Sequence, residues 1–230
     1  MPFVAARRSA ALLLMSLVAA CGGANPPAPV ASAASVHRVP LLSGARAAQV
    51  AHRGVLTPTD VPGAHVAAAK PDLAMERSFY ACLHQAYPKY AARDFGRTFT
   101  MPDGSSITSS VDVAPTVARG ASDFAILSSP NYSKCQQRAG SSLLRTKGIQ
   151  LLGMRLEQRP VNVPGADKSL LSMMTLTLRA HGRTQPLLVM DIASLVGQCE
   201  VALEVVPQGP SVSYANAMGL MTAAVNRVAG

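Results

Sequence analysis

The chain has 230 residues; 49% are apolar, and 21 lysines and arginines against 12 acidic residues give a net charge of +9. This length and composition exclude a wholly disordered chain and allow one domain with a substantial core. The basic residues are scattered and lack interleaved aromatic side chains, which argues against a nucleic-acid partner. The positive charge is better explained by attraction to anionic lipid or to an envelope polymer, or simply by solubility.

The N-terminus has the zones of an export signal. Arg7 and Arg8 form a positive start, and residues 10–20 are uncharged and mostly apolar. That run is too short to cross about 30 Å of hydrocarbon, so it indicates a signal peptide that is removed. Two alanines precede Cys21 and a glycine follows it, a pattern typical of a lipoprotein signal. We therefore expect residues 1–20 to be cleaved, and Cys21 to carry a lipid anchor of palmitate-type chains on the extracytoplasmic face of the cell membrane.

Two further regions follow the signal. Residues 21–42 are rich in proline, alanine and serine, and such a stretch cannot bury enough apolar surface to offset its ordering entropy. We predict that they form a tether between the lipidated cysteine and a single domain of residues 43–230.

The first half of this domain mixes helices with one hairpin. Helices are predicted over residues 43–52, 72–86, 115–127 and 130–145, and a one-turn helix begins at Thr57-Pro58. Alternating residues on either side of a Pro-Asp-Gly-Ser turn predict a β-hairpin of 95–101 with 107–113.

The second half is strand-rich. Strands are predicted over residues 149–157, 170–180, 186–195 and 199–206, and Ser211 is expected to cap a last helix. Together the elements predict an α+β fold, with an antiparallel sheet of about five or six strands and helices packed on it.

Three cysteines remain beside Cys21, namely Cys82, Cys135 and Cys199. Export leads to an oxidising compartment, so one disulfide and one free thiol are expected, and the residues alone leave all pairings open. There is no C-x-x-C motif and no histidine at ligand spacing from a cysteine. The sequence therefore predicts no metal site and no cofactor.

The sequence contains no motif of a known catalytic site, and no catalytic residue is predicted. Asp112 and Asp123 lie on different predicted elements, and no spacing forces two acids together for glycoside chemistry. His84, on the helix of Cys82, is the histidine expected to be partly buried, as a structural residue. A hydrolase whose site is assembled from distant residues remains an alternative. The ten methionines, two of them at 173–174, are compatible with an adaptable apolar binding surface or with ordinary core.

Three segments carry a resemblance to a known group. Residues 55–63 (Val-Leu-Thr-Pro-Thr-Asp-Val-Pro-Gly), the Ala-Cys-Leu at 81–83 and the segment from Ser128-Ser129-Pro130 to Cys135 resemble motifs of actinobacterial, mycobacterial-type envelope lipoproteins. That group is similar to the extracellular sensor domain of PknH-type receptor kinases, an antiparallel sheet with a helical layer and a cleft. The resemblance spans residues 50–230.

The resemblance implies that Cys82 pairs with Cys135, and Cys199 then stays reduced. The sensor domain has a second disulfide for which this chain lacks the cysteines. From these points we expect a lipid-anchored, sensor-like domain without enzymatic activity that binds a ligand, a lipid or a protein partner.

Overall fold

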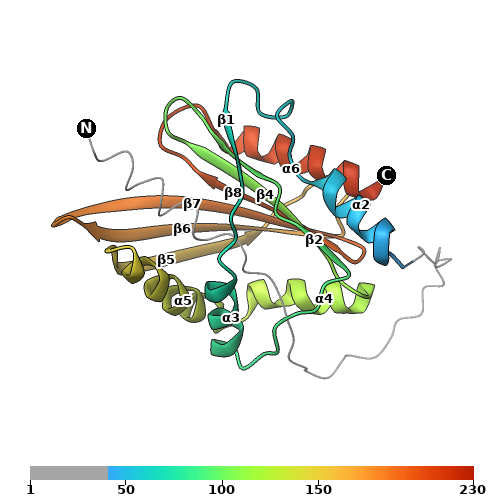
Figure 1. The fold of residues 1–230 in the computed structure, drawn as a ribbon, viewed down its shortest axis with the longest axis horizontal. Helices are drawn as coiled ribbons and strands as arrows, with labels where there is room; N and C mark the ends of the chain where they lie inside the picture. Colours follow the sequence, from blue (N-terminus) through green and yellow to red (C-terminus); the bar gives the residue numbers. More distant parts are fainter. Residues whose placement is uncertain (1–40) are drawn as a thin grey trace.

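The computed structural model describes residues 41–230. Its α-helices are α2 (Gly44–Gly54), α3 (Leu73–Cys82), α4 (Val117–Ala125), α5 (Tyr132–Thr146) and α6 (Tyr214–Ala229), and a 3-10 turn η1 (Ile126–Ser128) follows α4. Its strands are β1 (His65–Ala68), β2 (Ala92–Asp94), β3 (Arg97–Thr100), β4 (Ser106–Val113), β5 (Gln150–Pro160), β6 (Lys168–Ala180), β7 (Arg183–Val196) and β8 (Cys199–Val206). Figure 1 shows their arrangement.

The strands form one antiparallel sheet in the order β1-β3-β4-β8-β7-β6-β5, and β2 pairs with β4 beside β3. The predicted α+β class is therefore confirmed, with more strands than expected. The additional strands are β1 and β2, with four and three residues, which are too short to leave an alternating pattern in the sequence. The β6–β7 hairpin is the longest, and its turn holds His181 and Gly182 at positive φ.

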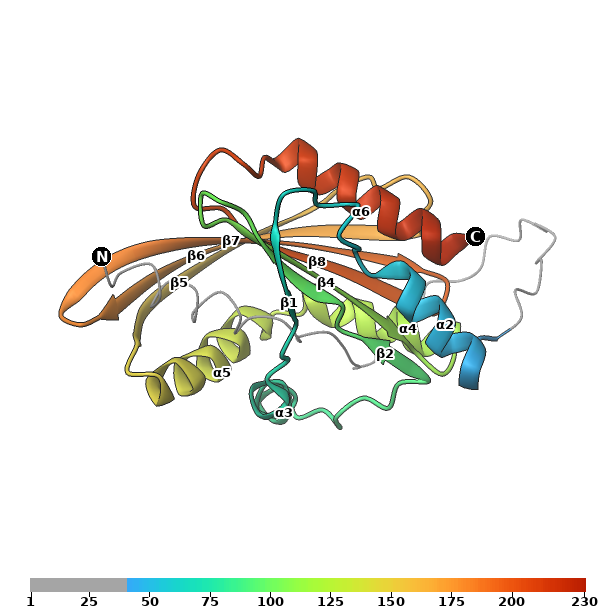
Figure 2. The same ribbon diagram turned by 45° about the horizontal axis from the view of Figure 1, so that its top comes forward.

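Helices cover both faces of the sheet. Helices α2 and α6 pack on one face, and α3, α4 and α5 lie on the other (Figures 1 and 2). On the α6 side, Val201, Leu203 and Val205 of β8 are fully buried against apolar residues of α6 such as Met221. Gly54 allows α2 to lie this close to α6, because a Cβ there would come within 2.5 Å of the Val228 side chain.

Four local expectations were wrong. Residues 57–60 form a turn and no helix begins there. The Asp60 carboxylate closes this turn by accepting hydrogen bonds from both the amide and the hydroxyl of Thr57. The cap of α6 is Ser213, whose Oγ accepts from the amide of Asn216, not Ser211.

The helix predicted over residues 72–86 also ends earlier, at Cys82. There His84 adopts a left-handed conformation (φ 56°) and the Gln85 amide donates back to the Tyr80 carbonyl, a common helix-ending pattern. His84 is consequently exposed, whereas we expected it to be partly buried.

Candidate functional site

Strand β8 carries two glutamates, four residues apart, on the face of the sheet that α3, α4 and α5 cover. Side chains alternate across a strand, so Val201, Leu203 and Val205 point toward α6, and Glu200, Ala202 and Glu204 point the other way. Glu200 and Glu204 are 5% and 4% exposed. Two glutamates of one strand are thus buried beneath helices.

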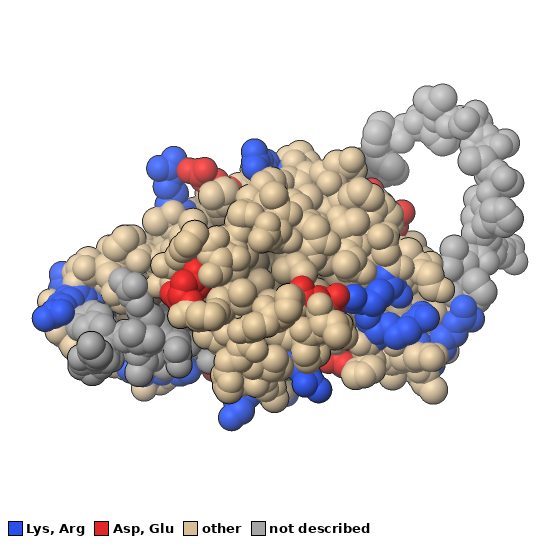
Figure 3. Space-filling view, turned by 90° about the horizontal axis from the view of Figure 1, so that it is seen from above, with Lys and Arg blue, Asp and Glu red and all other residues tan. Residues whose placement is uncertain are grey.

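Neighbouring strands place further acids beside these two. Asp112 of β4 lies directly opposite Glu200, and Asp191 of β7 lies directly opposite Glu204. Asp123 of α4 lines the same pocket as Asp112 and Glu200. We call these residues the acidic face: Asp112, Asp123, Asp191, Glu200 and Glu204. With Glu76 of α3 they are half of the twelve acidic residues in the chain, and few acidic side chains are visible on the surface in Figure 3.

Arg93 of β2 balances one end of the acidic face. Its guanidinium lies 2.6 Å from Glu76 Oε1 and 2.6 Å from Asp112 Oδ1, and its centre is 4.4 Å from the ring of Tyr90 and of Phe95. Tyr87 donates a further hydrogen bond to Glu76. One arginine therefore neutralises two buried carboxylates, a geometry that suits its planar fork of donors.

A narrow pocket under α4 lies next to this ion-pair network. It is lined by Tyr90, Asp112, Ala114, Gly120, Asp123, Gln198 and Glu200, and its volume of about 10 Å³ has room for a group the size of one water molecule. Gly120 lets α4 approach the β7–β8 turn, because a Cβ there would lie 3.2 Å from the backbone of Gln198. Arg119 pairs with Asp123 at 2.6 Å, one turn apart on α4.

Burial raises the pKa values of the carboxyl groups in this pocket. Burial raises the pKa of Asp112 to about 6, although the neighbouring Arg93 lowers it. Burial raises the pKa of Glu200 further, and the charges of Asp112 and Asp123 add to this effect. Glu200 Oε1 accepts no hydrogen bond from any residue that the structure describes. Glu200 is thus a buried carboxyl with an unused acceptor that lines a pocket.

The Glu204–Asp191 pair is the least compensated part of the acidic face. Burial raises the pKa of both carboxyls, and the charge of Asp191 raises that of Glu204 further. Within residues 41–230 no arginine or lysine forms an ion pair with either residue. Glu204 Oε2 is buried without a hydrogen-bond partner among the described residues.

Polar side chains continue from this pair across the sheet. Cross-strand pairing gives one row over six strands: Thr98, Thr108, Glu204, Asp191, Ser172 and Gln158. Gln158 closes the row at the β5 edge by donating hydrogen bonds to Ser172 Oγ and to the carbonyl of Leu127. The row thus runs beneath the helices and ends at an exposed residue.

Helix α5 packs over β5 and contributes Tyr132 and Gln136 to this side of the sheet. Burial raises the pKa of Tyr132, and the charges of Asp191 and Glu200 raise it further. Gln136, one turn further along, is 1% exposed and donates to the sulfur of Met174 at 3.9 Å. Its Oε1 accepts no hydrogen bond from the described part of the chain.

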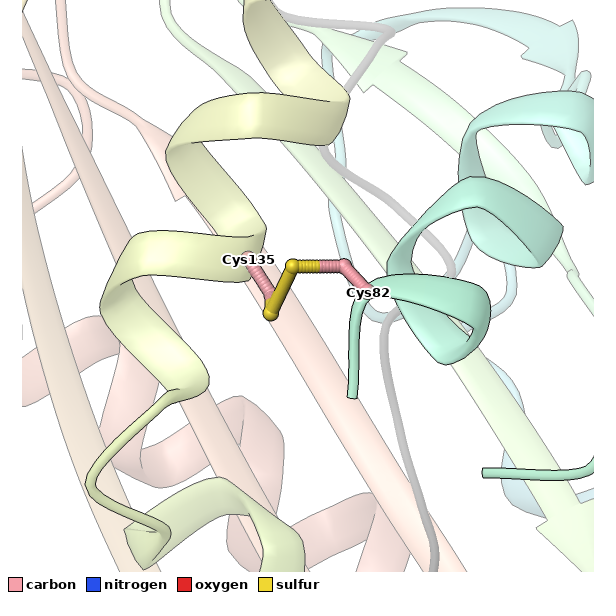
Figure 4. Close-up of a disulfide and its surroundings, with 2 residues drawn as sticks. All are labelled: Cys82 and Cys135. Carbon is pink, nitrogen blue, oxygen red and sulfur yellow. A yellow bond between two sulfur atoms is a disulfide. The ribbon is translucent and has the colours of Figure 1, made fainter. Parts of the chain in front are cut away.

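The disulfide implied by the resemblance is present and fixes two helices that cover this face. Cys82 at the end of α3 bonds to Cys135 in the first turn of α5, with Cα atoms 5.5 Å apart (Figure 4). Cys199 is a buried free thiol on the opposite face of the sheet, as expected. Cys21, the predicted lipidation site, lies outside the described residues.

The acidic face was missed by the sequence analysis. Asp112 and Asp123 lie on different elements, and no spacing in the sequence brings them together, yet they line one pocket. Between residues 41 and 230 no group of three or more histidine, cysteine or acidic side chains has the geometry of a metal site. No helix in that range is long and apolar enough to cross a bilayer.

Comparison with known proteins adds no family to this picture. No protein-family description matches the chain, and no curated protein is detectably similar to it in sequence.

Proposed function

We propose that this protein is a lipid-anchored envelope protein whose domain is a non-enzymatic, sensor-like binding module, with its ligand site on the acidic face. The observation that supports this most is the unused acceptor on each buried glutamate of β8. A buried polar atom without a partner costs free energy that a well-packed apolar residue would avoid. Perturbed, uncompensated carboxyls beneath covering elements are typical of sites that act on a ligand.

The small residues between the two acidic pairs support a binding surface at this place. Ala202 lies between Glu200 and Glu204 on β8, opposite Ser110 on one side and Ala193 on the other. Ala202 is only partly buried. Small side chains therefore separate the two acidic pairs, and the proposed ligand contacts both pairs across them.

The proposed envelope location rests on the first 42 residues and on the disulfide. A Cys82–Cys135 bond persists in an oxidising compartment and is rare in a reducing one. The membrane partner is then the bilayer, through lipid on Cys21, and the net charge of +9 favours anionic lipid or an envelope polymer nearby. The resemblance to mycobacterial-type lipoproteins and PknH-type sensor domains supports the same assignment.

The anchor is tested by Cys21→Ser. We expect the wild-type chain to partition into the detergent phase and the variant to remain in the aqueous phase or to stay unprocessed. A variant that partitions like the wild type contradicts the lipid anchor.

The binding function is tested by native mass spectrometry of the full chain, purified from membranes in detergent. We expect a bound small molecule in the wild type. We expect it to be lost in Ala202→Leu, which places a larger side chain between the two acidic pairs. Ala68→Leu, at an exposed position of β1, is the matched control and should retain the molecule. If the wild type carries nothing and an extract of envelope metabolites does not raise its melting temperature, the proposed function is wrong.

A hydrolase is the second candidate, and the two carboxyl pairs favour it. Residues directly opposite on neighbouring strands have Cβ atoms about 5 Å apart, so each pair places two carboxyl groups side by side, and glycoside hydrolysis uses two carboxyl groups. Purified protein is therefore assayed with generic glycoside, ester and peptide substrates. Turnover that Asp191→Asn abolishes establishes the enzyme and refutes the non-enzymatic proposal.

A further inference from the structure

No arginine or lysine among the described residues forms an ion pair with Glu204, Asp191 or Glu200, but the charge of Arg93 still acts on Glu200 and lowers its pKa. Arg93 serves Glu76 and Asp112, and Arg119 serves Asp123. No corresponding arginine or lysine reaches the pair in residues 41–230, although Glu204 is 4% exposed. The opposing charge that would compensate this pair is therefore supplied from outside the described chain or replaced by protons.

Two buried acceptors on this part of the face lack a hydrogen-bond donor within residues 41–230. Glu204 Oε2 and Gln136 Oε1 are buried acceptors without a donor among the described residues. The hydroxyls of Thr108 and Ser172 flank the pair on β4 and β6. Buried acceptors without a donor favour a ligand group that donates several hydrogen bonds and accepts none, and an ammonium group has this property.

Apolar side chains lie next to the pair on the same face of the sheet. Met174 and Val189 are cross-strand partners, both 0% exposed, two residues from Ser172 and Asp191 respectively. The Gln136 side-chain amide donates to the Met174 sulfur, so Gln136 lies against the Met174–Val189 pair. Methionine adapts its shape to what it contacts, so a short carbon chain can pack here by local side-chain movement.

We propose that the Glu204–Asp191 pair binds the ammonium group of an alkylamine-type ligand, whose carbon chain packs on Met174 and Val189. The inference rests on the proposed binding function and names the class of ligand. An ammonium donates to Glu204 and Asp191, and its charge replaces the cation that the pair lacks.

Binding of this kind is coupled to proton release. The nearby titratable groups are Tyr132 of α5, whose pKa Asp191 raises, and Glu200 on the same face of β8, and neither brings a positive charge. Burial raises the carboxyl pKa values, so the free pair holds protons that it must lose to bind a cation. An alkylammonium, with a pKa of about 10 like that of lysine, stays charged throughout. Affinity should therefore rise as pH increases from about 5.5 to 7.5, by up to about tenfold per pH unit for each proton released.

The test uses isothermal titration calorimetry of the full chain with three probes of equal length: hexylammonium, hexanol and hexanoate. We expect only hexylammonium to bind, with a heat that depends on the ionisation enthalpy of the buffer. Glu204→Gln and Asp191→Asn, which keep side-chain shape, should each weaken binding about 10- to 100-fold. Glu157→Gln, at an exposed position of β5, is the control and should bind like the wild type.

Circular dichroism shows which variants fold, and either variant of the pair is sufficient for the decision. If hexanol or hexanoate binds as well as hexylammonium, or if hexylammonium binds equally to both variants, the ammonium inference is wrong while a binding site remains. If none of the probes binds, the ammonium inference is also wrong. The proposed function is judged separately, by the molecule that co-purifies with the wild type.

Discussion

The two faces of the sheet are both covered by helices, but they differ in how their buried polar groups are satisfied. On the α6 side the buried serine hydroxyls are paired, since Ser169 and Ser194 bond to each other at 2.8 Å and Ser109 accepts from the Leu56 amide. Arg227 of α6 keeps a buried Nε without a partner among residues 41–230, but its other two nitrogens donate to Asp60 and to the Val55 carbonyl. On the α5 side, Glu200, Glu204 and Gln136 each keep a buried oxygen without a partner among residues 41–230. The α6 face therefore serves folding, whereas the acidic face keeps groups that folding alone does not favour.

The disulfide gives the largest expected difference between the faces. Cys82→Ser with Cys135→Ser opens a loop of 53 residues and should lower the free energy of unfolding by about 4 kcal/mol. Hydrogen exchange should accelerate in α3 and α5 while α6 keeps its protection. Cys199→Ala, in the apolar α6-side core, is the control and should cost about 1 kcal/mol. Equal acceleration in α6 and in α5 contradicts the separation of the two faces.

Loss of Arg93 should have the next largest effect on the free energy of unfolding. Arg93→Met leaves Glu76 (0% exposed) and Asp112 without their cation, and unpaired buried charges of this kind cost about 3 kcal/mol or more. Arg155→Met removes an ion pair whose arginine is 80% exposed and should change the unfolding free energy by less than about 0.5 kcal/mol. Urea unfolding measures both. Similar losses in the two variants argue against a buried network at Arg93.

The pH dependence sharpens the comparison further. An acid whose pKa is raised by folding binds its proton more tightly in the folded state, so stability is lost as pH rises from the unfolded pKa to the folded one. With a pKa of about 6 for Asp112 and about 7 for Asp191, the window runs from about pH 4 to pH 7.

Each such group contributes up to about 1.4 kcal/mol per pH unit within its own range. Asp103, whose pKa two backbone amides lower to about 2, acts with the opposite sign, but only below about pH 4. We expect urea unfolding to show a falling stability from pH 4.5 to 7, a shallower fall in Asp191→Asn and an unchanged fall in Glu157→Gln. A stability that rises over this range contradicts the assignment.

Part of the acidic face could have been predicted from sequence. Gly197 and Gln198 form a two-residue turn, so Val196 pairs with Cys199, and counting back along both strands places Asp191 opposite Glu204. The pairing of Asp112 with Glu200 could not be counted in this way, because β4 and β8 are far apart in the chain.

The sequence pattern also could not predict which segment covers the acidic face. Alternation in β8 separates Glu200 and Glu204 from Val201 and Leu203, and it favours a solvent-exposed face for the glutamates. The segment that covers them, α4 to α5, lies between β4 and β5, and its own periodicity does not state which face of the sheet it crosses. Only the packed structure shows that both faces are buried.

The central claim is that Glu204 is retained for binding at a cost to folding, and Glu204→Met tests it most directly. Methionine is similar in length, apolar and adaptable, so it removes the unpaired buried carboxyl without leaving a cavity. We predict that at pH 7 the variant gains about 1–2 kcal/mol in free energy of unfolding and no longer binds hexylammonium. A variant that loses more than about 1 kcal/mol of stability, or that binds hexylammonium as the wild type does, contradicts the claim.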